Sequence, residues 1–282
     1  MRQISDRNMR YNFYDYNTRV WHWIDPDFMA SGANVYADRS GFGNLQVEPG
    51  SGVAMVVAHT GTGISLHPVL ARDYEPGAGI FEFGSGPDGF SSPVLVTGGN
   101  GWAHIALFDN ENRGGVWYSR CTTWCEFEPP RIISEPGFPS FNIAASSVSE
   151  KVVIVWVDSF GGDSIYYLLS TDGGTTWSDT ISLTPPPGYG GDTITSFSKL
   201  GPFPYFDRSD RLHFVVDVLP VVNDTARVVP AGIWHWCETN YRGGLYVAWE
   251  EFDSTNVEPL TNLLRANIWL AGSSDNGQTW RG

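Results

Sequence analysis

The chain has 282 residues, of which 17 are basic and 31 acidic, so its formal net charge at pH 7 is −14. No basic run could neutralise phosphates, which argues against nucleic acid as a partner. No window reaches the roughly 18 apolar residues that a membrane-spanning helix requires, so no span is predicted. Abundant aromatic residues, with 32 Gly and 18 Pro, indicate many short strands joined by tight turns.

Five apolar runs along the chain each end in a polar residue. They are Val53 to His59, Trp102 to Asp109, Val152 to Asp158, Leu212 to Asp217 and Leu245 to Glu250. The first two begin about 50 residues apart, the length of a four-stranded propeller blade. Because most are apolar on both faces, they are predicted to be second strands, each sandwiched between neighbouring blades.

Shorter strands flank these runs across glycine-containing turns. Asn44 to Glu48 and Pro93 to Thr97 are expected first strands, because Pro49-Gly50 and Gly98-Gly99 turns follow them. Expected third strands are Gly115 to Tyr118, Ser164 to Leu169, Asn267 to Leu270 and, near the N-terminus, Arg19 to Ile24. Gly232 to Trp236 fits either a third strand or the first strand of the next blade.

Together these elements predict six hairpin units in one all-β domain spanning residues 1–282. The units lie near residues 11–24, 53–71, 102–118, 152–169, 212–236 and 245–270. We therefore expect a β-propeller of four-stranded antiparallel blades, most simply with six blades. The step from Leu212 to Leu245 is too short for a full blade, and either a shortened blade or a segment missing near residues 237–244 would explain it. The last blade needs its outer strand from the N-terminus or from beyond residue 282.

One turn sequence occurs twice with the template S-x-D-x-G-x-T-W. In such a turn the Asp accepts hydrogen bonds from backbone N–H groups, the Gly supplies a positive φ, and the Trp anchors the turn in the sheet. The residues with these structural roles are Ser170, Asp172, Gly174, Thr176 and Trp177 in the first copy and Ser273, Asp275, Gly277, Thr279 and Trp280 in the second.

This repeat resembles the Asp box, also called the BNR repeat, of the sialidase (neuraminidase) family of β-propellers. The segment Ser119 to Trp124 keeps only the ends of the template and is interpreted as a decayed copy. The resemblance implies a propeller fold, in which the box stabilises a blade on the face away from any active site. It also implies an exported or cell-surface protein, and because Met1 to Gln3 lacks an apolar signal core, the signal peptide is expected to be absent from this sequence.

Polar residues at the ends of the second strands are expected to surround the mouth of the central channel. The resemblance implies that two carboxyl groups, or a Tyr–Glu pair and an acid, could cleave a glycosidic bond there. The catalytic candidates are Asp109, Asp158, Glu250 and Tyr241, and the ligand-binding candidates are His59, Asp217, Arg39, Arg113, Arg242 and Arg265.

Two observations weigh against catalysis. Each strand-end carboxylate could simply cap a turn. The early Arg-Ile-Pro or Arg-Leu-Pro motif of sialidases is also missing, and Arg39 is its only early substitute. We therefore carry two hypotheses: an exported propeller that recognises extracellular glycan, with possible glycoside hydrolase activity, and a non-catalytic structural or cell-surface interaction module.

Neither a metal nor another cofactor is predicted. Asp109 to Gly114 loosely resembles a calcium loop, but Arg113 replaces an oxygen ligand and no downstream Glu completes it. The three cysteines, Cys121, Cys125 and Cys237, do not make a disulfide framework. In an extended strand the Cα atoms of Cys121 and Cys125 would lie about 13 Å apart, so only a turn would permit a bridge.

Overall fold

The computed structural model consists of β-strands that fall into two compact units, Met1–Trp234 and His235–Gly282. It describes residues 8–22, 32–61, 65–110, 114–124, 126–134, 140–157, 164–183, 194–197, 202–222, 225–226, 232–238, 245–257, 264–273, 279 and 281. In this part of the chain, no helix is long and apolar enough to cross a membrane.

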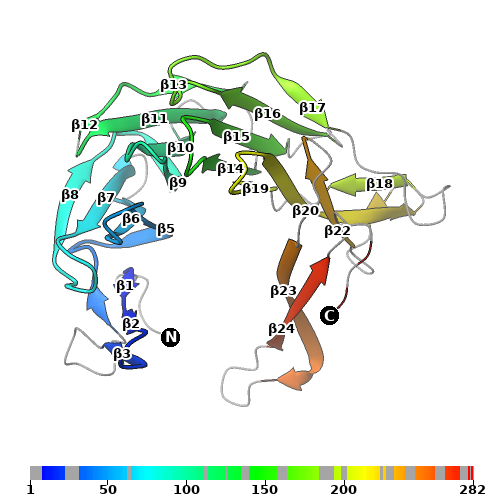
Figure 1. The fold of residues 1–282 in the computed structure, drawn as a ribbon, viewed down its shortest axis with the longest axis horizontal. Coiled ribbons are helices and arrows are strands. Elements are labelled where there is room, and N and C mark those ends of the chain that lie inside the picture. Colours follow the sequence, from blue (N-terminus) through cyan, green and yellow to red (C-terminus); the bar gives the residue numbers. More distant parts are fainter. Residues whose placement is uncertain are drawn as a thin grey trace. The chain divides into compact units, whose positions relative to one another are not determined.

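The first complete antiparallel sheet, blade 1, follows the order of the chain (Figure 1). Its strands are β5 (Ser40–Val47), β6 (Ala54–Thr60), β7 (His67–Asp73) and β8 (Phe81–Ser85). The apolar run predicted as a second strand is β6, and five of its seven residues in succession are buried. This burial on both faces confirms the predicted position between other layers.

Blade 2 repeats this arrangement with a divided outer strand. It contains β9 (Phe90–Thr97), β10 (Ala103–Asp109) and β11 (Val116–Thr123), and both β12 (Glu126–Phe127) and β13 (Arg131–Ile132) pair with β11. The second strand β10 is again buried along most of its length. Strands β10 and β11 of blade 2 thus form a hairpin in the third predicted unit, near residues 102–118.

Blade 3 is the most regular of the sheets. It consists of β14 (Ser140–Ala145), β15 (Val152–Val157), β16 (Ile165–Ser170) and β17 (Ile181–Leu183) in that order. All six residues of β15 are buried, as its uninterrupted apolar sequence predicts.

Blade 4 is built around one long strand, β20 (Leu212–Val222). Its pairing partners are β18 (Ile194–Phe197), β19 (Phe203–Phe206), the short β21 (Thr225–Ala226) and β22 (Gly232–Cys237), whose first residues belong to the same compact unit. The pairing of β22 with β20 favours the third-strand alternative for Gly232 to Trp236.

Small two-stranded sheets make up the rest of the described chain. Near the N-terminus, β1 (Arg10–Tyr11) pairs with β4 (Ala33–Asn34), and β2 (Phe13–Asp15) with β3 (Val20–His22). In the second unit, β23 (Leu245–Val257) pairs with β24 (Leu264–Ser273). The hairpins expected at both ends of the chain are therefore present, whereas a closed ring of six blades stays a prediction.

The blades of the first unit pack in the manner of a propeller. Strand β5 lies against β9, β9 against β14, and β14 against β19, so the first strands of successive blades are neighbours. Alternate residues of blade 2 serve different interfaces: Leu95 packs into the apolar cluster shared with blade 1, and Val96 into the cluster shared with blade 3. Side-chain alternation along a strand thus makes each blade the core of two interfaces.

Candidate functional site

The first copy of the repeated turn, Ser170 to Trp177, is called the box below, and it closes the turn after β16 with the predicted hydrogen bonds. Asp172 accepts from the backbone N–H of Thr176 (2.9 Å) through Oδ1 and from the Thr176 hydroxyl (2.7 Å) through Oδ2. The buried Ser170 hydroxyl accepts from the Gly174 N–H (2.8 Å) and donates to Asp172 (2.8 Å). These hydrogen bonds lower the pKa of Asp172 from its ordinary 3.8 to about 2, and the bond from the Thr176 hydroxyl has the largest effect.

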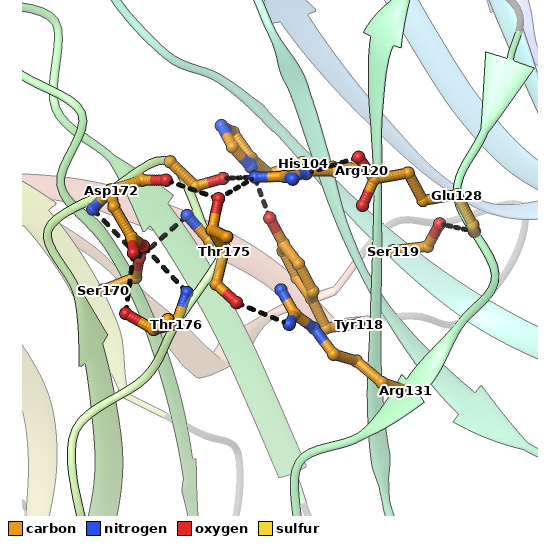
Figure 2. A network of polar contacts seen from close by, with 12 residues as sticks. His104, Tyr118, Ser119, Arg120, Glu128, Arg131, Ser170, Asp172, Thr175 and Thr176 are labelled. Carbon is orange, nitrogen blue, oxygen red and sulfur yellow. Dashed lines mark hydrogen bonds and ion pairs between the residues drawn. The ribbon is translucent and has the colours of Figure 1, made fainter.

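The box of blade 3 docks on blade 2, as Figure 2 shows. Arg120 of β11 donates to the Gly173 carbonyl (2.5 Å) and to the Thr175 hydroxyl (2.9 Å). Tyr118, from the same strand, packs edge-to-face on Trp177 with ring centroids 5.0 Å apart. The box therefore fixes the spacing of two blades as well as its own turn.

The buried His104 contacts Tyr118, which packs on Trp177 of the box. His104 is 1% exposed, and its Nδ1 lies 2.7 Å from the Tyr118 hydroxyl. Burial lowers the pKa of His104 to about 4, and the nearby Arg120 guanidinium acts in the same direction. The ring is thus held neutral in the folded protein.

The second box, residues 273–280, lies almost wholly outside the described residues. The strand ends that bracket it are described, and they repeat the closure of the first box. Arg281 donates its N–H to the Gly272 carbonyl (2.8 Å), as Ser178 does to the Leu169 carbonyl (2.9 Å). Each pair joins the residue before a box to the residue after it.

The segment interpreted as a decayed copy forms no such turn. Ser119 to Thr123 continues β11 as a strand, and Cys121 pairs with Phe127 of β12. The physical reason is that this segment lacks both the Asp acceptor and the Gly with positive φ. Cys121 itself is buried in the apolar cluster between blades 1 and 2, while Cys125 lies outside the described residues.

A cavity of about 500 Å³ lies at the other end of the blade 3 strands. In blade 3 the box follows Ser170, which pairs with Val152 at one end of β15, whereas the cavity-lining Ser140 pairs with Val157 at the other end. Its lining comes from the first strands of three blades and from β10: Phe42, Gly43, Asn44, Ser92, Pro93, Val94, Phe108, Ser140 and Phe141.

Two matching irregularities shape this cavity. The register of β5 against β6 shifts between Gly41 and Asn44, and the register of β9 against β10 shifts opposite Ser92. Phe42 and Ser92, at these bulges, have φ of 51° and 49°, which non-glycine residues rarely adopt. A bulge re-aims a side chain, and Phe42 is accordingly 61% exposed beside the cavity.

Hydrogen bonds between blades 1 and 2 hold this region in place. Asn44 Oδ1 accepts from the Leu95 N–H (3.1 Å), and His59 Nδ1 accepts from the Ser92 N–H (3.3 Å). The His59 ring also lies 5.3 Å from the Phe42 ring, measured between centroids. His59 therefore supports the two residues with positive φ.

Three of the catalytic and ligand-binding residues predicted from the sequence have side chains that the structure describes. His59 lies next to the cavity, as above. Asp109, 2% exposed, ends β10 directly after the cavity-lining Phe108, and its carbonyl accepts from the Gly114 N–H (2.9 Å). Arg39 is exposed just before β5. The structure thus brings His59 to the cavity wall and leaves Asp109 in the adjacent strand end.

The other predicted site residues cannot be placed as side chains. Asp158, Arg113, Tyr241 and Arg242 lie outside the described residues. Asp217, Glu250 and Arg265 lie in strands β20, β23 and β24, and of these three residues only the backbone is described. Their catalytic and binding roles stay predictions. Among the described residues, no group of His, Cys, Asp and Glu could hold a metal ion.

The sequence analysis missed the aromatic residues of the cavity. Phe108 lies in the predicted second strand Trp102 to Asp109, whereas Phe42 and Phe141 lie outside the predicted strands, and none of the three is among the predicted site residues. One local signal was present: Phe42 stands between Gly41 and Gly43, and glycine within a strand often marks a bulge or a close approach.

Several known proteins that are similar to this chain have names that refer to polysaccharides. No family model matches the sequence. Over 116 residues it is 31% identical to a probable oligoxyloglucan-reducing end-specific xyloglucanase of Neosartorya fischeri, a match covering 34% of this chain and only 14% of that protein.

Among solved structures, the chain is similar to a polysaccharide lyase, the PL25 ulvan lyase, bound to -[GlcA(1-4)Rha3S]-. The TM-score is 0.57 at 12% identity, over 95% of this chain and 76% of that one. A second structure of a PL25 ulvan lyase gives 0.58 at 10% identity, with the same coverage. At such identities the likeness shows the fold, an all-β, propeller-like arrangement.

Proposed function

We propose that this chain is a glycan-recognising β-propeller of the Asp-box type, with six blades, and that it belongs to an exported carbohydrate-active protein. The observation that carries the proposal is the cavity between the first strands of blades 1 to 3, whose lining includes three Phe rings and three small polar side chains. Its volume of about 500 Å³ is in the range of ligand pockets.

Several further features support this proposal. The cavity and the Asp box of blade 3 lie at opposite ends of that blade, as the sialidase resemblance implies for a site and a structural turn. The match to a xyloglucanase and the likeness to an ulvan lyase both involve proteins whose names refer to polysaccharides.

One observation favours binding without turnover as a second candidate function. None of the nine lining residues that the structure describes carries an ionisable side chain, whereas glycoside hydrolysis usually requires two carboxyl groups on either side of the scissile bond. A hydrolase would therefore have to recruit acids from outside this lining, such as the predicted Asp109, Asp158 or Glu250.

A panel of polysaccharides tests both versions. The purified chain is incubated with each polymer, and reducing ends and unsaturated products are measured alongside binding. Turnover that is abolished in Asp109→Asn, Asp158→Asn or Glu250→Gln would establish the enzyme. Binding without any product would establish the recognition module, and a chain that neither binds nor cleaves any polymer would overturn the proposal.

A further inference from the structure

We propose that the cavity lined by Phe42, Phe108 and Phe141 accepts an uncharged sugar unit of a polysaccharide, stacked on aromatic rings and oriented by the Asn44 amide. This inference rests on the proposed function and specifies the ligand class of the same site. It differs from the expectation drawn from the sequence, in which arginines are among the ligand-binding residues.

The aromatic lining suits the apolar face of a sugar ring. Each of the three phenylalanines comes from a different strand, β5, β10 or β14, so the rings surround one space. A phenyl ring offers no hydrogen bond, and it gains contact energy from the C–H groups that a pyranose presents on its faces. Phe42, 61% exposed, is the ring most open to a ligand.

The described lining of the cavity offers no cation to an anionic ligand. Binding of a carboxylate or sulfate group is strongest where Arg or Lys donates to it, and none of the nine described lining residues is Arg or Lys. The adjacent His59 accepts a hydrogen bond from the Ser92 N–H through Nδ1, so this nitrogen stabilises the cavity wall. The chain's net charge of −14 adds a general repulsion of anions.

Asn44 provides the direction that stacking lacks. Its Oδ1 accepts from the Leu95 N–H (3.1 Å), which fixes the rotation of the amide. The NH2 end carries two donors, and it makes no hydrogen bond to another described residue. Sugar hydroxyls are suitable acceptors for these donors, and the hydroxyls of Ser92 and Ser140 in the same lining can donate or accept.

Affinity gel electrophoresis tests the inference with named polymers. Xyloglucan, xylan and mixed-linkage glucan serve as neutral probes; ulvan and polygalacturonate serve as anionic ones. We expect at least one neutral polymer to retard the protein at both low and high salt, because screening does not weaken stacking. Phe42→Ala should weaken this binding by about tenfold, and Asn44→Asp, which keeps the acceptor for Leu95 but replaces the donors by a charge, should weaken it further.

Phe83→Ala is the matched control, since Phe83 is also a half-exposed phenylalanine of blade 1 but lies on the outer strand β8. Urea unfolding of each variant shows whether the fold is retained. Neutral binding that Phe42→Ala and Asn44→Asp leave unchanged would overturn the inference while the proposed function stands. Salt-sensitive binding to the anionic polymers alone would also overturn the inference and leave the proposed function standing. If no polymer retards the protein, both proposals fail.

Discussion

Replacement of Gly174 by Ala tests whether the box at Ser170 to Trp177 holds blade 3 against blade 2. Gly174 has φ of +78°, and a Cβ added there would collide with the hydroxyl of Tyr118. Gly101 provides a matched control, because its φ is also +78° and nothing lies within 4 Å of the added atom. The two substitutions share the backbone cost and differ in the contact with Tyr118.

The magnitudes can be worked from these environments. A left-handed conformation costs a non-glycine residue about 1 to 2 kcal/mol, so Gly101→Ala should lower the free energy of unfolding by about 1 kcal/mol. In Gly174→Ala the Tyr118 hydroxyl must also move away from His104, its buried partner at 2.7 Å. Leaving buried polar groups unpaired costs about 1 to 3 kcal/mol, which brings the expected total to about 3 kcal/mol.

Equilibrium unfolding in urea, followed by tryptophan fluorescence, measures this difference. The midpoint should fall further for Gly174→Ala than for Gly101→Ala, with a similar dependence on urea concentration. Equal losses in the two variants would refute the reasoning, since they would mean that the box does not press on Tyr118 in solution.

Three further predictions concern the supports of the blades. Because the pKa of His104 is lowered on folding, the unfolded chain binds a proton between pH 6.5 and about 4 that the folded chain does not, so the free energy of unfolding should fall over that range. His104→Gln should make the free energy of unfolding depend less steeply on pH, and an unchanged dependence would contradict the burial of a neutral His104. Asp172→Ala should lower the free energy of unfolding by about 1 kcal/mol, after allowance for solvent screening, without changing polymer binding. In the wild type, the stability that the carboxylate contributes should be lost as the pH falls from 3.8 towards 2. A loss of polymer binding in a folded variant would argue against a purely structural role for Asp172. Asp210→Ala removes the acceptor of the Ser146 and Ser149 hydroxyls (2.5 and 2.8 Å) and should cost about 1 to 2 kcal/mol in urea unfolding; no change would show that this contact between blades 3 and 4 contributes little.

The strands could be predicted from the sequence because burial on both faces leaves a clear pattern. The run Val152 to Val157 is apolar throughout, and all six residues of the corresponding β15 are buried. The box at Ser170 to Trp177 could be predicted for a similar reason: the hydrogen bonds that close its turn are local, joining residues at most four positions apart. Local chemistry therefore determines both features.

The cavity could not be predicted, because contacts between distant parts of the chain create it. Asn44 and Leu95 meet across 51 positions, and His59 and Ser92 across 33. The positive φ of Phe42 and Ser92 arises from register shifts that depend on the neighbouring strand. The charged residues at strand ends indicated Asp109 instead, which is buried beside the cavity-lining Phe108.

A crystal structure of the chain with a neutral oligosaccharide, such as one from xyloglucan, would test the central claim most directly. The account predicts a sugar ring in van der Waals contact with Phe42, Phe108 or Phe141, with a hydroxyl accepting a hydrogen bond from the Asn44 amide. An oligosaccharide ordered elsewhere on the molecule, with this cavity left empty, would contradict it.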